Sequence, residues 1–188
     1  MNNYKKNLDL LIRNHVYSKE MEHDACGVGL IASTEGKKSR AVVEYGIEAL
    51  KAVWHRGAVD ADGKTGDGAG IHVEIPKDFF IEKIEVTGHD YDNSEICVGM
   101  IFLPKNDYSS QENCKTIVES ELTKNNFSIY GWRQVPVNPK ILGEKALQTM
   151  PEIIQVLFKS NDPNLLDKNL ERKIYETRKR IENKAFDA

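Results

Sequence analysis

The stretch EHDACGVG, residues 22–29, places Cys26 between an alanine and a glycine, at the start of an apolar run. Free cysteine is among the most buried residue types, so Cys26 taken alone is more typical of a core thiol than of a nucleophile. A catalytic cysteine needs a base, because a thiol with a pKa near 8.5 is mostly protonated at pH 7. Its own α-amine, with a pKa of about 7.7 to 8.0, is such a base only if the bond from Ala25 is cut. The context of Cys26 must therefore decide between a buried thiol and an N-terminal nucleophile.

The composition describes an ordinary globular protein. The 188 residues carry a net charge of −3, with 40% hydrophobic and 29% charged residues. The chain has no excess of positive charge, so a nucleic-acid partner is not indicated. No run approaches the roughly 20 apolar residues of a membrane helix. The N-terminus has charges throughout and no apolar signal core, so we expect a cytoplasmic protein without membrane contact. Three cysteines, odd in number and far apart, predict free thiols, with Cys97 and Cys114 in the core.

Hydrophobic periodicity predicts alternating strands and helices. A buried strand is expected at 27–34, closed by a polar turn at 35–38, and a helix at 39–54 follows. We expect the helix after residue 108 to start with a capping box of Ser109 and Glu112 and to reach Asn125. The basic residues of the last helix are expected to form a solvated face. The other predicted elements are strands at 71–75, 96–104, 127–137 and 151–158 and a helix at 170–181.

Residues 55–70, HRGAVDADGKTGDGAG, form a long loop that is too rich in glycine and aspartate for a regular element. The loop does not match a phosphate-binding G-x-x-x-x-G-K-[ST] motif, because Ala58 stands where the first glycine is required. It is not an EF-hand either, since Ile71 and Thr65 replace the required glutamate and glycine. His23 and Cys26 form a single pair without the second pair of a zinc site, so we expect no metal site. Long ordered loops of this kind are usually functional.

Five stretches, in this order along the chain, closely resemble the glutaminase domain of the glutamate synthase large subunit. The stretches are EHDACGVGLIA (22–32), HRGAVDADGKTGDGAGI (55–71), GWRQVPVNPKILGEKAL (131–147), PEIIQV (151–156) and ERKIYETRKRIEN (171–183). This family is a class II glutamine amidotransferase with an N-terminal nucleophile. The resemblance implies the α+β class, as a four-layer αββα Ntn-hydrolase sandwich that is incomplete at the C-terminal side.

The resemblance also implies a division of the chain and roles for particular residues. Residues 1–25 are expected to be a propeptide, and residues 26–188 the N-terminal part of the amidotransferase domain. Cys26 is then the catalytic nucleophile that hydrolyses glutamine to glutamate and ammonia, and Arg56 and Gly57 border the active site. Residues 60–70 are assigned only as active-site border. The resemblance implies no cofactor in this chain, since FMN and an iron–sulfur cluster belong to the rest of a synthase. The expected partners are the remainder of the large subunit and a small subunit.

Two other interpretations remain open at this stage. Segments corresponding to the family's oxyanion donors and substrate-binding arginine are not found, so a fragment, a split gene or a degenerate copy all fit the sequence. A truncated, noncatalytic module that associates with a partner subunit is therefore the alternative function. An amidotransferase of the purine pathway fits less well, because DADGKTGDGAGI (60–71) and GWRQVPV (131–137) resemble the glutamate synthase branch.

Overall fold

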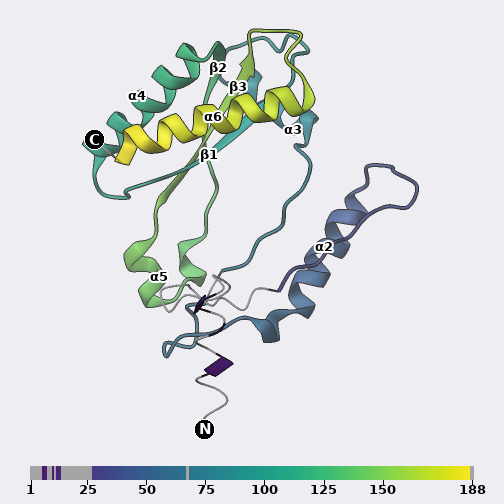
Figure 1. Ribbon diagram of the computed structural model, residues 1–188, viewed down its shortest axis with the longest axis vertical. Coiled ribbons are helices and arrows are strands. Elements are labelled where there is room, and N and C mark those ends of the chain that lie inside the picture. The colour runs from purple at the N-terminus through teal and green to yellow at the C-terminus, as the bar shows by residue number, and fades with distance from the viewer. Residues whose placement is uncertain (1–5, 8–9, 11, 14–26, 67, 187–188) are drawn as a thin grey trace. The chain divides into compact units, whose positions relative to one another are not determined.

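The computed structural model describes residues 6–7, 10, 12–13, 27–66 and 68–186, except for the side chain of Arg56. The chain divides into two compact units, whose elements are labelled in Figure 1. Unit 1 comprises Met1–Val59 and Gly66–Ile71, and unit 2 comprises Asp60–Thr65 and His72–Ala188. The short 60–65 stretch thus belongs to unit 2, although the residues that flank it belong to unit 1.

Unit 2 is built on a three-stranded antiparallel sheet. The strands are β1 (Cys97–Leu103), β2 (Phe127–Gln134) and β3 (Glu152–Ser160). Their order is β1-β3-β2, so β3 pairs with a neighbour on each side. The strands predicted at 96–104, 127–137 and 151–158 are therefore confirmed, with ends that differ by a few residues.

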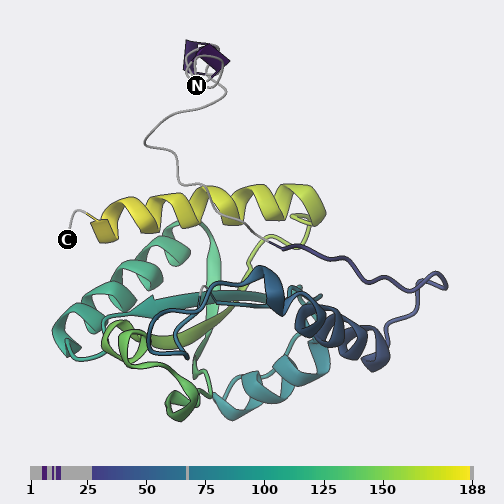
Figure 2. The same ribbon diagram turned by 90° about the horizontal axis from the view of Figure 1, so that it is seen from below.

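Helices cover both faces of this sheet. Side chains alternate between faces along a strand, and in β3 Val156 and Phe158 face one cluster while Leu157 faces another. The first cluster includes residues of α4 (Tyr108–Lys124) and α6 (Asp167–Phe186), and the second includes residues of α3 (Lys77–Val86). Figure 2 shows α6 and α3 on opposite sides of the sheet. The α+β class is confirmed, and the described residues form one sheet of an incomplete sandwich.

Unit 1 contains α2 (Arg40–Ala52), which confirms the helix predicted at 39–54. The side chain of Ser39 accepts a hydrogen bond from the Ala41 N–H and caps the helix. A 3₁₀ turn, η1 (Trp54–Arg56), follows α2. None of the α2 residues is buried, and Trp54 is 78% exposed.

Two predicted strands are wrong. Residues 27–34 and 71–75 form no strand, and Val28, Leu30 and Val73 are exposed. A strand requires a neighbour for its backbone N–H and C=O groups, and no described residue pairs with either stretch. The polar turn is confirmed: the Gly36 N–H donates to the Ser33 carbonyl at 3.2 Å, and Gly36 has a φ of +65°.

The start of α4 was also mispredicted, and three short elements were not expected. Asp107, and not Ser109, caps α4, because its carboxylate accepts hydrogen bonds from the Ser110 N–H at 3.0 Å and from its hydroxyl at 2.6 Å. In α3, Phe80 and Ile84 lie one turn apart and both are buried. The other unexpected elements are η2 (Pro139–Ile141) and α5 (Glu144–Thr149).

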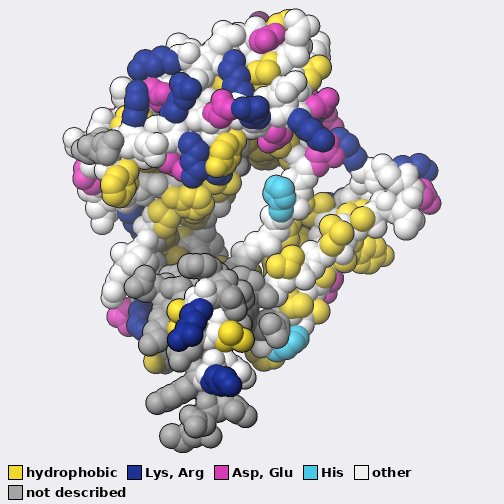
Figure 3. Space-filling model, viewed as in Figure 1, with side chains coloured by type: hydrophobic (Ala, Val, Ile, Leu, Met, Phe, Trp, Pro, Cys, Tyr) yellow, Lys and Arg dark blue, Asp and Glu magenta, His cyan; other side chains and the backbone are white. Residues whose placement is uncertain are grey.

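The charged face of α6 is solvated, as predicted. Its basic residues pair with glutamates of the same helix, as in Arg172–Glu176 and Arg178–Glu182. Figure 3 shows basic and acidic side chains interleaved over this helix. Among the described helices, none is both long and apolar enough to cross a membrane.

Glu121 joins α4 to α6 through a buried carboxylate. Its Oε1 lies 2.5 Å from Lys184 Nζ and 3.5 Å from Lys124 Nζ, while its side chain is only 4% exposed. The hydrogen bond from Lys184 is the main cause that lowers the pKa of Glu121 below its usual value of 4.5. The stabilisation by this charge is therefore fully present above pH 4.5 and lost as the pH falls through the lower pKa of the folded state.

We expect Glu121→Gln to lower the free energy of unfolding at pH 7 and to make its decline below pH 4.5 shallower than in the wild type. Urea unfolding between pH 3 and pH 7 measures both effects. The matched control is Glu112→Gln, which removes the surface ion pair with Lys115. Identical pH profiles for the Glu121→Gln protein and the wild type would show that the charge of Glu121 does not contribute to the free energy of unfolding, and would contradict this prediction.

Candidate functional site

The candidate site begins at the HRG turn, residues 55–57. It follows α2 directly, and the Gly57 N–H closes the turn by donating to the Trp54 carbonyl at 3.0 Å. Gly57 has φ −82° and ψ 146°, which any residue can adopt, and a Cβ placed on it would lie 3.4 Å from Trp54 O. The local backbone therefore does not explain why a glycine stands at the exposed position 57.

The next segment is a tight hairpin whose tip we call the 60–65 turn. Val59 and Gly66 form an antiparallel bridge within unit 1. Inside the turn, the Asp60 N–H donates to Thr65 O at 2.7 Å and the Gly63 N–H donates to Asp60 O at 2.9 Å. Gly63 has a φ of +69°, where a residue without Cβ is favoured. The expected long loop is thus ordered by its own hydrogen bonds at this point.

Asp62 is fully engaged as a hydrogen-bond acceptor. Its Oδ1 accepts from the N–H groups of Lys64 at 2.9 Å and Thr65 at 2.7 Å, and its Oδ2 accepts from Thr65 Oγ1 at 2.5 Å. These bonds, led by that of the Thr65 hydroxyl, hold the pKa of Asp62 well below its usual range. Asp62 therefore serves the structure of the turn and is not suited to be a proton acceptor near neutral pH.

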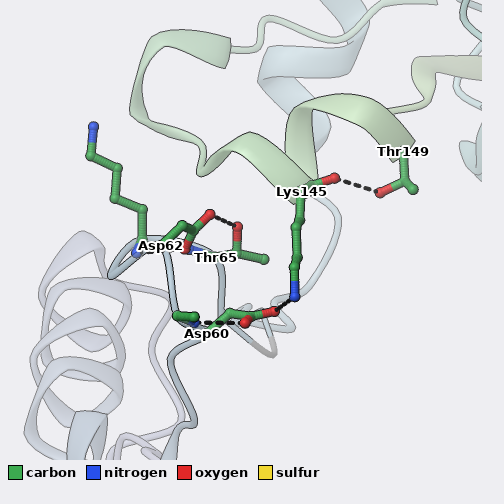
Figure 4. A network of polar contacts seen from close by, with 7 residues as sticks. Asp60, Asp62, Thr65, Lys145 and Thr149 are labelled. Carbon is green, nitrogen blue, oxygen red and sulfur yellow. Dashed lines mark hydrogen bonds and ion pairs between the residues drawn. The ribbon is translucent and has the colours of Figure 1, made fainter.

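Asp60 binds Lys145 of α5. Lys145 Nζ lies 2.5 Å from Asp60 Oδ2, and this bond is the main cause that lowers the pKa of Asp60. Figure 4 shows the lysine reaching from α5 to Asp60, with the Asp62–Thr65 bond beside it. Gly143, the residue before α5, is buried. A Cβ on Gly143 would overlap Thr65 Oγ1 and Asp62 Oδ2 and would lie 2.6 Å from Thr65 N. The 60–65 turn therefore packs against the first residues of α5.

Of the predicted site residues Cys26, Arg56 and Gly57, only Gly57 is fully described by the structure. Gly57 is placed in the HRG turn, whereas Cys26 and the side chain of Arg56 lie outside the described residues. Sequence reasoning missed Gly143 and Lys145, although both lie in the GWRQVPVNPKILGEKAL stretch. Gly143 followed by Glu144 is a recognisable helix start, but no local signal pairs it with a turn about 80 residues earlier. Within the described part of the chain, no three His, Cys, Asp or Glu residues are grouped to hold a metal ion.

The other two cysteines are free thiols, as predicted. Cys97 is buried in the sheet, and burial raises the pKa of its thiol to about 12. Cys114 is only half-buried, so its expected core position is wrong; Val118 and Leu122, one and two turns further along α4, enter the core instead.

We expect Cys97 to resist a thiol reagent in the native protein and to react after unfolding, because the thiolate is the reactive species. Cys97→Ala should lower the free energy of unfolding by roughly 1–3 kcal/mol. Thiol titration in urea should find all three cysteines free. Detection of a disulfide between Cys97 and Cys114 by mass spectrometry would contradict this assignment.

Comparison with known proteins finds one matching family and several similar proteins. Residues 26–188 match the family described as glutamine amidotransferases class-II. The chain is 52% identical over 179 residues to the glutamate synthase [NADPH] large chain of Azospirillum brasilense, covering 95% of this chain and 12% of that protein. It is 41% identical over 162 residues to ferredoxin-dependent glutamate synthase 1 of Arabidopsis thaliana, covering 86% of this chain and 10% of that protein. A ferredoxin-dependent glutamate synthase of Pyropia yezoensis is 39% identical over 166 residues. The chain thus spans about a tenth of the length of these relatives.

Proposed function

Because the chain belongs to the class-II glutamine amidotransferases, we propose that it acts in the glutaminase step of a glutamate synthase. The observation that carries this proposal is the family match itself, which begins at Cys26 and continues to residue 188. The similarity to synthases named for NADPH and for ferredoxin supports the glutamate synthase branch.

In the proposed reaction Cys26 is the first residue of the mature chain, after removal of residues 1–25. Its α-amine accepts the thiol proton, and the sulfur attacks the side-chain amide carbon of glutamine. The tetrahedral oxyanion collapses to a thioester and expels ammonia, which leaves with the proton held by the amine. Water then attacks the thioester, releases glutamate and restores the thiol.

Arg56 and Gly57 are proposed to border the glutamine site. Gly57 is exposed, and its backbone conformation does not require a glycine. The missing side chain leaves room beside the HRG turn, which supports a place at the border of the site. The 60–65 turn is proposed as part of the same border.

The remaining parts of the proposal concern partners and location. The remainder of the large subunit and a small subunit are the proposed partners, and they would carry the flavin and the iron–sulfur cluster. We propose a cytoplasmic location for the protein.

The test is glutamine hydrolysis by the full-length product of the gene and by the 188-residue chain alone. The proposal predicts equal amounts of glutamate and ammonia from the full-length product. Hydrolysis by that product but not by the chain alone would identify the chain as a part that needs the remainder. Absence of hydrolysis in both, with residues 1–25 removed, would contradict the proposal and favour the noncatalytic module.

A further inference from the structure

The sheet of unit 2 has two outer strands, β1 and β2, and the edge of β1 is open. Apart from the pairing with β3, no backbone hydrogen bond joins β1 to any other residue that the structure describes. An outer strand presents a row of unpaired N–H and C=O groups with which another strand can pair. The edge of β1 therefore has room for one more strand.

The other outer strand, β2, is protected against such pairing. A register shift between Ile129 and Gly131 interrupts its pairing with β3. At this point the Tyr130 carbonyl accepts a hydrogen bond from Thr87 Oγ1 at 2.8 Å. β2 also carries a charged residue, Arg133. Bulges and charged side chains are usual means by which proteins prevent pairing at an outer strand.

β1 has none of these protections. Its residues, CVGMIFL, include no charge and no proline, and its register with β3 is unbroken. Met100 is 49% exposed and Phe102 is 63% exposed. Because side chains alternate along a strand, Val98, Met100 and Phe102 lie on one face of the sheet. An uncharged outer strand with exposed apolar side chains readily pairs with a further strand.

β1 and its flanking residues are self-complementary about Met100. When two copies are paired antiparallel with Met100 opposite Met100, Val98 of each copy lies opposite Phe102 of the other. In the same register Glu95, before the strand, lies opposite Lys105, after it, and both residues are exposed. Apolar pairs and opposite charges across neighbouring strands are both favourable. The register therefore joins apolar to apolar residues and acidic to basic residues on both sides of Met100.

We propose that two copies of the chain pair through β1, antiparallel and about a two-fold axis at Met100, and so join their three-stranded sheets into one. The ion pair of Glu95 with Lys77 does not prevent this pairing. It uses only Oε2 of Glu95, and both side chains are about half exposed, so Glu95 can also bind Lys105 of the second copy. The proposal concerns unit 2 alone and does not depend on the proposed glutaminase step.

Sedimentation equilibrium of the 188-residue chain tests this pairing. The mean mass should rise from 21.3 kDa toward twice that value as the protein concentration is raised over a roughly hundredfold range. Met100→Lys should weaken the association roughly 5- to 10-fold, because like charges would face each other at the axis. Leu166→Lys is the matched control at another half-exposed apolar residue, and it should leave the association unchanged.

A charge swap tests the register of the two strands. Lys105→Glu should weaken the association roughly 3- to 10-fold, because two acidic side chains would then lie opposite each other. Glu95→Lys should weaken it for the corresponding reason. The double variant should recover the association of the wild type, since opposite charges face each other again. Residues 95 and 105 are both exposed, so all three variants should keep the wild-type circular dichroism spectrum.

Three results would overturn the proposal. The first is a wild-type chain that stays at 21.3 kDa at every concentration. If the β1 amides of such a monomeric chain are protected from hydrogen exchange in a larger assembly, a segment other than a second copy occupies the edge. The second is an association that Met100→Lys leaves unchanged. The third is a double variant of residues 95 and 105 that associates no better than the single variants.

Discussion

Replacing Cys26 with alanine is expected to abolish glutamine hydrolysis by the full-length product, by at least roughly 10⁴-fold in kcat. The reason is that the proposed mechanism passes through a thioester on this sulfur, and alanine offers no nucleophile. Loss of the thiol should also block removal of residues 1–25, if the same sulfur attacks the carbonyl of Ala25. The measurements are release of glutamate and ammonia and the intact mass of the purified protein.

Two further variants make this prediction specific. Cys26→Ser retains a weaker nucleophile and should be processed more slowly than the wild type. Cys114→Ala is the matched control, since Cys114 lies half-buried in α4, outside the proposed site, and its loss should leave activity intact. Wild-type activity in the Cys26→Ala protein would rule out Cys26 as the nucleophile.

Replacing Leu157 with alanine is expected to lower the free energy of unfolding by roughly 2–5 kcal/mol, the usual cost of a cavity at a fully buried leucine. Leu157 is 0% exposed, lies in the central strand β3 and packs in one cluster with Phe80, Ile84 and Tyr130. Its truncation therefore removes contacts between the sheet and α3 that no neighbour is placed to restore.

Urea unfolding followed by circular dichroism measures this loss. Leu166→Ala is the control with the same chemical change, and because Leu166 is 52% exposed we expect a change within roughly 0.5 kcal/mol. Equal losses in the two variants would contradict the assignment of β3 as the centre of the core.

Local sequence patterns predicted the elements that have a strong hydrophobic periodicity or a long apolar run. Helices α2 and α6 were recognisable because their apolar residues recur every three or four positions, and β3 because it is a long apolar run. The run at 27–34 looks as apolar as β1, yet only β1 forms a strand, because β3 pairs with it. Pairing depends on a partner distant in sequence, which a local pattern does not contain.

In the candidate site, too, local features could be predicted from the sequence, whereas contacts between residues distant in sequence could not. The glycine-rich character of residues 55–70 predicted an ordered, irregular loop, and Gly63 has the positive φ that such a loop requires. Cys26 and Arg56 were assigned by resemblance alone, and their roles stay predictions. The contact of Asp60 with Lys145 was not foreseen, because both residues resemble ordinary surface charges until the fold brings them within 2.5 Å.

The central claim is that Cys26 works as an N-terminal nucleophile, with its own amine as the base. The most direct test is the intact mass of the protein fraction that hydrolyses glutamine. We predict that every active molecule begins at Cys26 and that glutaminase activity rises in proportion to the processed fraction. Full activity from molecules that still begin at Met1 would contradict the account, because an amide nitrogen at Cys26 is not basic.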